Sequence, residues 1–300
     1  MGRNALWSEE RPPTFQRLGE RVLAQLLGQG VFLYIDDILI YTSTEEEHLR
    51  LLNEVLRRLK DAGLKVSMEK SSWMTQEVQY LGYVIGHGTL KMDPAKVEAI
   101  MRVKTPRERA DENGGRYSPS LKKQVKSFLG AAGFYRRFIK DFATLTACLT
   151  DLTRDGKRQA WEERHTIAWK KVQRRLASKP VLAQPDPDRH YYIDTDASNT
   201  GLGAVLIQKD DLGQPHPIAY ASRKMSPAEV LYSTREQEAL AILFAIDEFN
   251  DFVKGRRFTV ITDHRSLSWL MKVPILKGRL LNWAYKLRSY DFNIMYRKRC

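Results

Sequence analysis

The 300-residue sequence predicts an α/β fold of the α+β type, in which short sheets and helical segments occupy separate stretches of the chain. Apolar runs bounded by turn residues, such as Val31–Ile35 and Ile38–Tyr41, are typical of buried strands. Leucines that recur every three or four residues from Leu49 onwards indicate an amphipathic helix. Near the C-terminus three strand-like runs precede one long helix, which favours an antiparallel meander over a strict strand–helix alternation.

The composition excludes several classes of protein. Hydrophobic residues make up 43% and aromatic residues 10% of the chain, so it can bury a core and is not disordered throughout. Two cysteines, Cys148 and Cys300, cannot build a disulfide framework or a four-cysteine zinc site. The longest apolar run, Ala239–Ile246, is well short of the ~20 residues that cross a bilayer. These features predict an intracellular protein without a membrane partner.

The first block, residues 1–104, reads as helix, strand, tight turn, strand and helix. Thr44 caps the second helix in capping-box spacing with Glu47, and Gly63 marks its end. Strands over residues 79–85 and 89–92 then form a hairpin through Gly86–Gly88. A short helix follows from the Asp93-Pro94 pair.

The second block, residues 105–180, carries most of the chain's net charge of +13. Residues 105–120 lack periodicity and predict a flexible surface loop, and helical spacing returns over 121–142 and 161–176. Residues 95–180 contain 21 Lys and Arg against nine Asp and Glu. Such a one-sided block predicts a polyanionic partner, with nucleic acid favoured because phosphate neutralisation releases counterions. The alternative is a basic region that serves only solubility.

The third block, residues 181–300, follows a linker marked by Pro180, Pro185 and Pro187. Its pattern predicts strands over 191–196, 201–208 and 217–222, a helix over 234–253 and a fourth strand over 258–262. Further helix is expected after this strand.

Asp36 and Asp37 are adjacent carboxylates between two apolar strands. At ~4 Å separation and an effective dielectric near 20 they would repel by about 4 kcal/mol, so a proton, an arginine or a divalent cation must offset them. No Lys or Arg lies between Gly28 and Thr44, which favours a metal such as magnesium. The alternative is an Asp-rich turn that faces solvent.

A second acidic group is predicted in the third block. Asp194 and Asp196 alternate on one face of a strand, Glu238 lies near the start of the long helix, and Asp263 ends a later strand. Acids at strand ends with one on a packed helix can hold two metal ions ~3.5–4 Å apart. Spacing alone does not choose between Asp194 and Asp196. Glu236 is interpreted as an ordinary acid of the helix start, whereas Glu238 is expected to face inwards.

Taken in order, these segments resemble the Ty3/gypsy class of retrotransposon Pol polyproteins from about residue 12 to 297. Tyr34-Ile35-Asp36-Asp37 resembles the YxDD hairpin of reverse transcriptases. Further motifs agree in order along the reverse transcriptase and ribonuclease H regions of that class: Thr14–Leu18, Glu47–Leu49, Tyr80–Tyr83, Phe128–Gly130, Tyr135–Ile139, Thr195–Ser198, Gly201–Leu206, Glu238–Ala241 and Thr262–His264.

The resemblance implies a partial palm over 1–104, a helical thumb or connection over 105–180 and a ribonuclease H-like mixed-sheet domain over 181–300. It makes Asp36, Asp37, Asp196, Glu238 and Asp263 the catalytic, metal-binding acids, with Mg²⁺ as the ion and Mn²⁺ as an alternative. Its expected nucleic-acid contacts are Tyr34, Lys70, Leu81, Gly82, Lys122, Lys123, Lys126, Arg136 and Arg137.

The same resemblance implies an RNA-directed DNA polymerase joined to a ribonuclease H. Its partners would be an RNA template, a DNA primer, RNA–DNA hybrid, deoxynucleoside triphosphates and the rest of the Pol polyprotein. The site of action would be the cytoplasm or a virus-like particle.

The sequence also departs from this family. Its further palm aspartate would lie upstream of Met1, its fourth nuclease carboxylate would lie beyond Cys300, and residues 105–120 resemble an insertion. We therefore expect a fragment truncated at both ends, without primer extension of its own. The alternative function is a catalytically inactive remnant that binds nucleic acid through its basic helices, and a purely structural scaffold is a third hypothesis.

Overall fold

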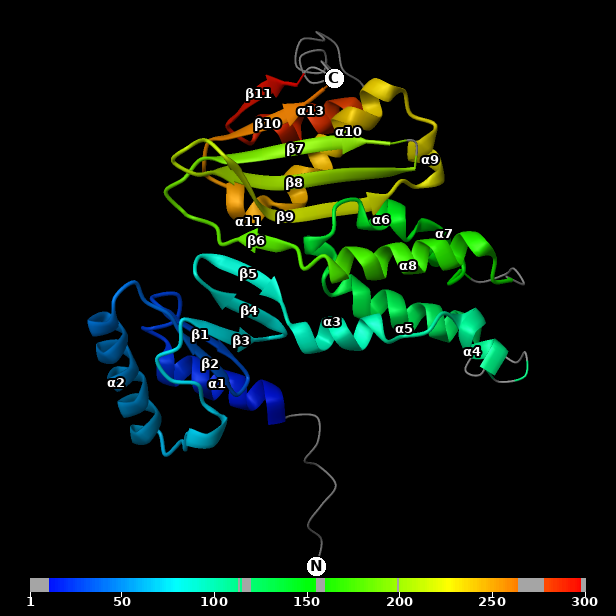
Figure 1. Ribbon diagram of the computed structural model, residues 1–300. Helices are drawn as coiled ribbons and strands as arrows, with labels where there is room; N and C mark the ends of the chain where they lie inside the picture. The colour runs from blue at the N-terminus through cyan, green and yellow to red at the C-terminus, as the bar shows by residue number, and fades with distance from the viewer. Residues whose placement is uncertain are drawn as a thin grey trace, which may run out of the picture. The chain divides into compact units, whose positions relative to one another are not determined.

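The computed structural model describes residues 11–112, 114, 120–154, 160–198, 200–263 and 278–297. The chain divides into two compact units, Met1–Leu81 and Gly82–Cys300 (Figure 1). No helix among the described residues is long and apolar enough to cross a membrane.

The first unit is built around one antiparallel hairpin. Its strands pair from Val31↔Ile40 to Tyr34↔Asp37, and its small core includes Leu23, Val31, Val55 and Leu59. The predicted cap at Thr44 is confirmed, because its hydroxyl accepts the Glu47 N–H at 3.3 Å. The elements are α1 (Arg11–Leu23), β1 (Val31–Tyr34), β2 (Asp37–Ile40), α2 (Glu45–Asp61), the 3₁₀ turn η1 (Met68–Lys70) and β3 (Glu77–Tyr80).

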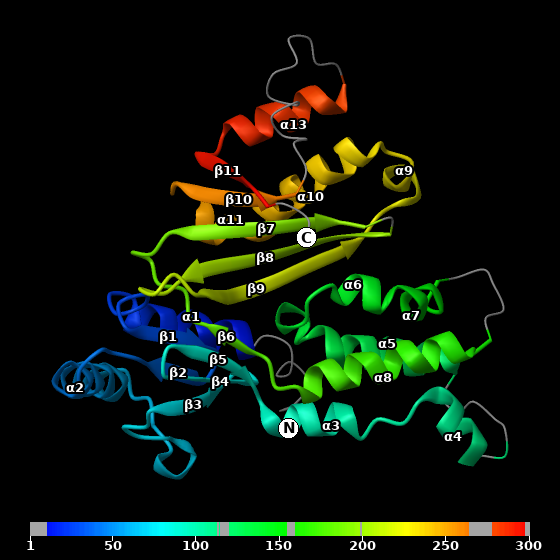
Figure 2. The same cartoon turned by 45° about the horizontal axis from the view of Figure 1, so that its top comes forward.

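The second unit begins with a hairpin and a helical block. The predicted turn at 86–88 is confirmed, since Gly86 pairs with Thr89 and both His87 and Gly88 have positive φ. In this block α5 and α8 lie side by side (Figure 2). The elements are β4 (Tyr83–Gly86), β5 (Thr89–Met92), α3 (Pro94–Met101), α4 (Pro106–Glu112), α5 (Leu121–Gly133), η2 (Arg136–Phe138), α6 (Phe142–Leu145), α7 (Ala147–Asp151), α8 (Glu163–Ala177) and β6 (Val181–Ala183).

Three local predictions need correction. Residues 106–112 form α4 instead of a loop, because Thr105 and Glu108 cap the helix reciprocally at 3.2 and 2.6 Å; residues 113 and 115–119 lie outside the described part. The expected linker contains β6, which pairs with β5 through Leu90↔Leu182. The strand expected over 79–85 is interrupted at Leu81-Gly82, where both residues have positive φ.

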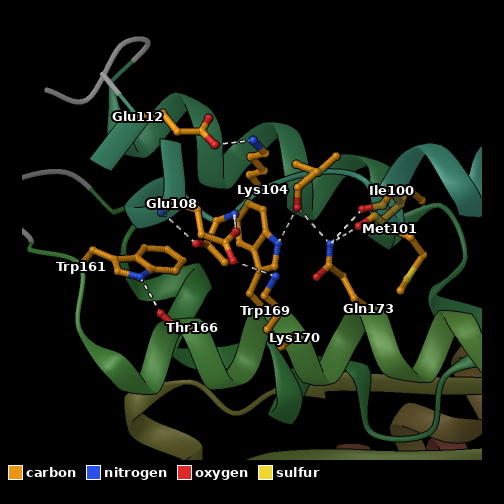
Figure 3. A network of polar contacts seen from close by, with 12 residues as sticks. Ile100, Met101, Lys104, Glu108, Glu112, Trp161, Thr166, Trp169, Lys170 and Gln173 are labelled. Carbon is orange, nitrogen blue, oxygen red and sulfur yellow. Dashed lines mark hydrogen bonds and ion pairs between the residues drawn. The ribbon is translucent and has the colours of Figure 1, made fainter. Parts of the chain in front are cut away.

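The core of the helical block is aromatic. The Phe128 ring of α5 stacks on the Trp169 ring of α8 at 3.6 Å between centroids. Gln173, also on α8 and buried, donates to the carbonyls of Ile100, Met101 and Val103 at the end of α3 (Figure 3). These contacts fix the three helices as one body.

A five-stranded mixed sheet completes the second unit and confirms the predicted meander. The order is β11-β10-β7-β8-β9; β7, β8 and β9 are antiparallel, and β10 runs parallel to both β7 and β11. Helices α10 and α13 pack on one face of the sheet with the core residues Ile193, Leu206 and Val260. The elements are β7 (Tyr191–Ala197), β8 (Gly201–Lys209), β9 (Pro215–Lys224), α9 (Pro227–Val230), α10 (Thr234–Glu248), α11 (Asn250–Val253), β10 (Phe258–Thr262), α13 (Arg279–Arg288) and β11 (Phe292–Tyr296).

Candidate active sites

The first candidate site is the turn of the β1–β2 hairpin. Tyr34 and Asp37 form the last pair of the ladder, so Ile35 and Asp36 make the two-residue turn. Ile35 has φ of 54°, a conformation that β-branched residues rarely adopt, and its N–H donates to the Gln16 side chain of α1 at 2.5 Å. Asp36 and Asp37 are exposed, as is Tyr34. The turn therefore presents two adjacent carboxylates to solvent.

Tyr80, which ends β3, lies close enough to this turn for the charge of Asp37 to act on it. Burial, followed by the negative charge of Asp37, raises the pKa of the Tyr80 phenol. Lys70 ends η1 and is exposed. Leu81 ends the first unit and is 38% exposed, and Gly82 opens the second unit with its carbonyl accepting from the Tyr135 hydroxyl at 2.8 Å.

The second candidate site lies at the carboxyl ends of β7 and β10. These parallel strands pair up to Asp194↔Ile261, after which Asp196 lies near the end of β7 and Asp263 follows β10 directly. The carboxyl ends of neighbouring parallel strands meet at the same edge of a sheet. Asp196 is exposed and Asp263 is half-buried.

Glu238 lies on helix α10, which packs against β7, and is only 2% exposed, in line with the expected inward orientation. Glu236 differs from it, because its carboxylate accepts from the Ser233 N–H and hydroxyl and pairs with Arg279. The interpretation of Glu236 as a helix-start acid is thereby confirmed.

Asp194 and Asp196 share one face of β7, but their surroundings differ. Tyr191, Ile193 and Thr195 are buried, so the two aspartates lie in the opposite phase of the strand from the residues that pack under α10. Asp194 pairs with Arg297 at 2.5 Å, and its pKa is raised mainly by burial, against the opposing effect of Arg297. Asp196 has no such enclosure and stays exposed.

Carboxylate oxygens are the donor set that hard divalent cations prefer, so Asp196, Asp263 and Glu238 are chemically suited to hold one. In the part of the chain that the structure describes, however, no three His, Cys, Asp or Glu side chains are grouped closely enough for a metal ion. Asp196 lies on the face of β7 opposite to the residues that pack under α10, whereas Glu238 belongs to α10 itself. This difference of sheet face is consistent with the lack of a three-acid group among the described residues.

The expected nucleic-acid contacts of the helical block fall into two groups. Lys123 and Lys126 are exposed one turn apart on α5, and Lys122 beside them is half-buried. Arg136 instead donates to the Ser222 carbonyl of β9 at 2.9 Å, and Arg137 is half-buried with its charge near the Tyr83 phenol.

Sequence reasoning missed Asp141, whose carboxyl has its pKa raised first by burial and also by Asp196. No local pattern marks it, because its neighbours come from distant strands.

Comparisons with known proteins match two parts of the chain to protein families. Residues 12–85 match the family described as reverse transcriptase (RNA-dependent DNA polymerase). Residues 161–260 match the RNase H-like domain found in reverse transcriptase.

Similar curated proteins are transposon polyproteins. The chain is 33% identical over 292 residues to the retrovirus-related Pol polyprotein from transposon 297 of Drosophila melanogaster, covering 96% of this chain and 26% of that protein. It is 30% identical over 296 residues to the corresponding polyprotein from transposon gypsy of the same organism, covering 94% and 27%. The transposon Tf2-3 polyprotein of Schizosaccharomyces pombe is 31% identical over 291 residues, covering 95% and 21%. The chain thus spans about a quarter of these relatives.

Solved structures of the foamy viral protease-reverse transcriptase share the fold. The complex with dsDNA matches with a TM-score of 0.80 at 25% identity, over 99% of this chain and 60% of that chain. The complex with RNA/DNA hybrid matches with a TM-score of 0.77 at 25% identity, over 96% and 38%.

Proposed function

We propose that this chain binds RNA–DNA hybrid and cuts its RNA strand at the edge of the mixed sheet where β7 and β10 end. The chain belongs to the retrotransposon Pol polyproteins and carries their reverse transcriptase and RNase H-like domains. The observation that carries the proposal is the arrangement of acids at that edge of the sheet. Asp196 lies near the end of β7, Asp263 directly follows the neighbouring parallel strand β10, and the buried Glu238 lies on α10, which packs against β7.

In this proposal each group has a separate task. Lys123 and Lys126 of α5 hold the phosphates of the duplex, and recognition proceeds by shape, phosphates and 2′-hydroxyls instead of base edges. Asp196, Glu238 and Asp263 are the oxygen ligands of a divalent cation, for which we propose Mg²⁺. When bound, the cation neutralises charge on the scissile phosphate and activates water. The low exposure of Glu238 excludes competing solvent from one side of the site.

For the reverse transcriptase segment we propose that Asp36 and Asp37 bind the divalent cation of nucleotide addition. Their exposure on a two-residue turn leaves both carboxylates accessible to a primer terminus, a template and a deoxynucleoside triphosphate. The rest of the Pol polyprotein is the proposed source of any further ligand. Tyr34, Lys70, Leu81 and Gly82 remain proposed contacts of the primer–template.

A hybrid-cleavage assay tests the nuclease proposal. With the RNA strand labelled and Mg²⁺ present, Asp196→Asn and Glu238→Gln should each cut at least about 100-fold more slowly than wild type, a loss of about 2.7 kcal/mol of transition-state stabilisation. Asp188→Asn, an exposed acid just before β7, and Glu248→Gln, exposed on the same helix as Glu238, should cut at the wild-type rate.

A second candidate function is nucleic-acid binding without catalysis, favoured by the lack of a three-acid group among the described residues. Equal cleavage by wild type and Asp196→Asn, or none by either, would remove the nuclease proposal. Retained, salt-dependent hybrid binding in that case would support the binding function.

A further inference from the structure

At the start of β8, two glycines allow the Asp141–Leu145 segment to pack closely against the strand backbone. Gly201 and Gly203 share one face of the strand. A Cβ atom at Gly203 would lie 2.6 Å from Oδ1 of Asp141, and one at Gly201 would lie 2.9 Å from Oγ1 of Thr144. Neither glycine has the positive φ that would call for glycine on conformational grounds. A methyl group at either position would therefore force the neighbouring side chain of the Asp141–Leu145 segment to shift.

The next strand holds the same segment with hydrogen bonds. The hydroxyl of Ser222 on β9 accepts the Ala143 N–H at 2.9 Å, and its carbonyl accepts from Arg136 at 2.9 Å. Ser222 is only 4% exposed, and both hydrogen bonds are partly buried. Further along β9, Lys224 binds both carboxylate oxygens of Asp151 at 2.9 Å.

The contacts of Gly203 and Ser222 involve one row of paired residues that crosses β7, β8 and β9. Gly203 pairs with Asp196 on β7 and with Ser222 on β9. Opposed residues of an antiparallel pair point to the same face, so Asp141 lies over the rung that carries Asp196. Asp141 has φ of 56° and ψ of 33°, a left-handed conformation that a non-glycine residue keeps only where its surroundings fix it.

We propose that Gly201, Gly203 and Ser222 form a docking seat for residues Asp141–Thr144 of this chain, and that Asp141 is a positioning residue for the strand end that carries Asp196. The seat holds the basic helical block against the sheet. Arg136 then serves docking and not phosphate binding. The effect on hybrid cleavage rests on the proposed function, whereas the docking itself does not.

Filling the seat tests the docking directly. In the full chain Gly203→Ala places a methyl group against the Asp141 carboxylate, so hydrogen–deuterium exchange of residues 141–146 should accelerate at least about tenfold. The double variant Gly203→Ala/Asp141→Gly should restore slow exchange, because glycine accepts the φ of residue 141 and leaves room for the methyl group. Gly130→Ala is the matched control, since a Cβ there meets nothing within 4 Å.

Ser222→Ala is a second variant that adds no bulk to the sheet. It removes the acceptor of the Ala143 N–H and should also accelerate exchange of residues 141–146. Unchanged exchange in both Gly203→Ala and Ser222→Ala, or faster exchange that Asp141→Gly does not reverse, would overturn the docking seat.

Cleavage kinetics test the positioning role. Gly203→Ala should lower kcat for hybrid cleavage about tenfold and leave Kd for hybrid within twofold, because the basic side chains of α5 are untouched. Asp141→Gly, alone or together with Gly203→Ala, removes the positioning carboxylate and should also keep kcat low, even though the double variant restores slow exchange. A proportional loss of Kd, or no change in kcat, would contradict positioning. If wild type itself cuts no hybrid, the proposed function fails, and the exchange results still decide the docking seat.

Discussion

At the scale of single residues, Glu229 is the acid with the most strongly lowered pKa in the sheet-bearing part of the second unit. Arg223 hydrogen-bonds its carboxylate at 2.8 and 2.9 Å and lowers its pKa from 4.5 to about 2, with the Ser226 backbone N–H assisting. A carboxylate with a lowered folded pKa stabilises the protein above its unfolded pKa, and this contribution is lost as pH falls from about 4.5 towards 2.

Glu229→Gln should therefore remove about 1–3 kcal/mol of the free energy of unfolding at pH 7, at 1.36 kcal/mol per pKa unit, and much less at pH 3. Urea unfolding at the two pH values measures this difference. Glu248→Gln, exposed on α10, should change stability little at either pH. A loss for Glu229→Gln that is equal at pH 7 and pH 3 would contradict the assigned ion pair.

The sequence could separate some acids at this scale and not others. The Ser233-x-x-Glu236 spacing is a capping box, which predicts a surface role for Glu236 from local pattern alone. Asp194 and Asp196 share one strand face, so their spacing does not separate them. In the structure Asp194 binds Arg297, 103 residues away, whereas Asp196 is exposed. Asp141 is similarly defined by distant β8 and not by its neighbours in sequence.

At the scale of elements, the helical block is held together by Gln173 in addition to its aromatic core. The Gln173 amide is the shared donor to three carbonyls at 3.0–3.1 Å where α3 ends (Figure 3). Gln173→Leu keeps the apolar stem but leaves these carbonyls without that donor, so the free energy of unfolding should fall by about 1–3 kcal/mol. Thermal unfolding measures the loss.

Lys171→Ala, exposed two residues earlier on α8, provides the control and should change stability by less than about 0.5 kcal/mol. Equal melting temperatures for Gln173→Leu and wild type would mean that water replaces the amide at these carbonyls, and that the helices do not rely on it.

The sequence predicted elements correctly where the spacing of apolar residues and the capping or turn residues indicated the same element, as in α2, α3 and the β7–β9 meander. It failed at α4 because the two turns of this helix are too short for a periodic signal, although Thr105-Pro106 and Glu108 already carry the capping box. It failed at β6 because three residues between prolines form a strand only by pairing with β5. Long-range pairing of short segments cannot be inferred from local pattern.

At the scale of the whole molecule, the sequence showed that basic residues are concentrated in the middle of the chain. It did not show which of these basic side chains are free of acidic partners and can contact phosphates. Several cations of the basic block are engaged by acids, as in Lys170–Glu108, Arg107–Glu163 and Lys104–Glu112. Arg136 is engaged by the Ser222 carbonyl. The count of 21 basic residues therefore overstates the charge that can meet phosphates. Lys123 and Lys126, exposed one turn apart on α5, are better candidates.

Each lysine that neutralises a phosphate releases condensed counterion, so log K for hybrid binding should fall less steeply with log salt when such lysines are removed. Lys123→Gln/Lys126→Gln should weaken binding at low salt and reduce the slope by up to about 2, at roughly 0.9 per phosphate contact. Fluorescence anisotropy of labelled hybrid across a salt series measures both. Lys60→Gln/Lys65→Gln removes the same charge from exposed positions in the first block, which has no net charge, and should leave the slope unchanged. Equal slopes for the two double variants would mean that α5 does not contact phosphate, and that the net charge of the chain alone attracts the nucleic acid.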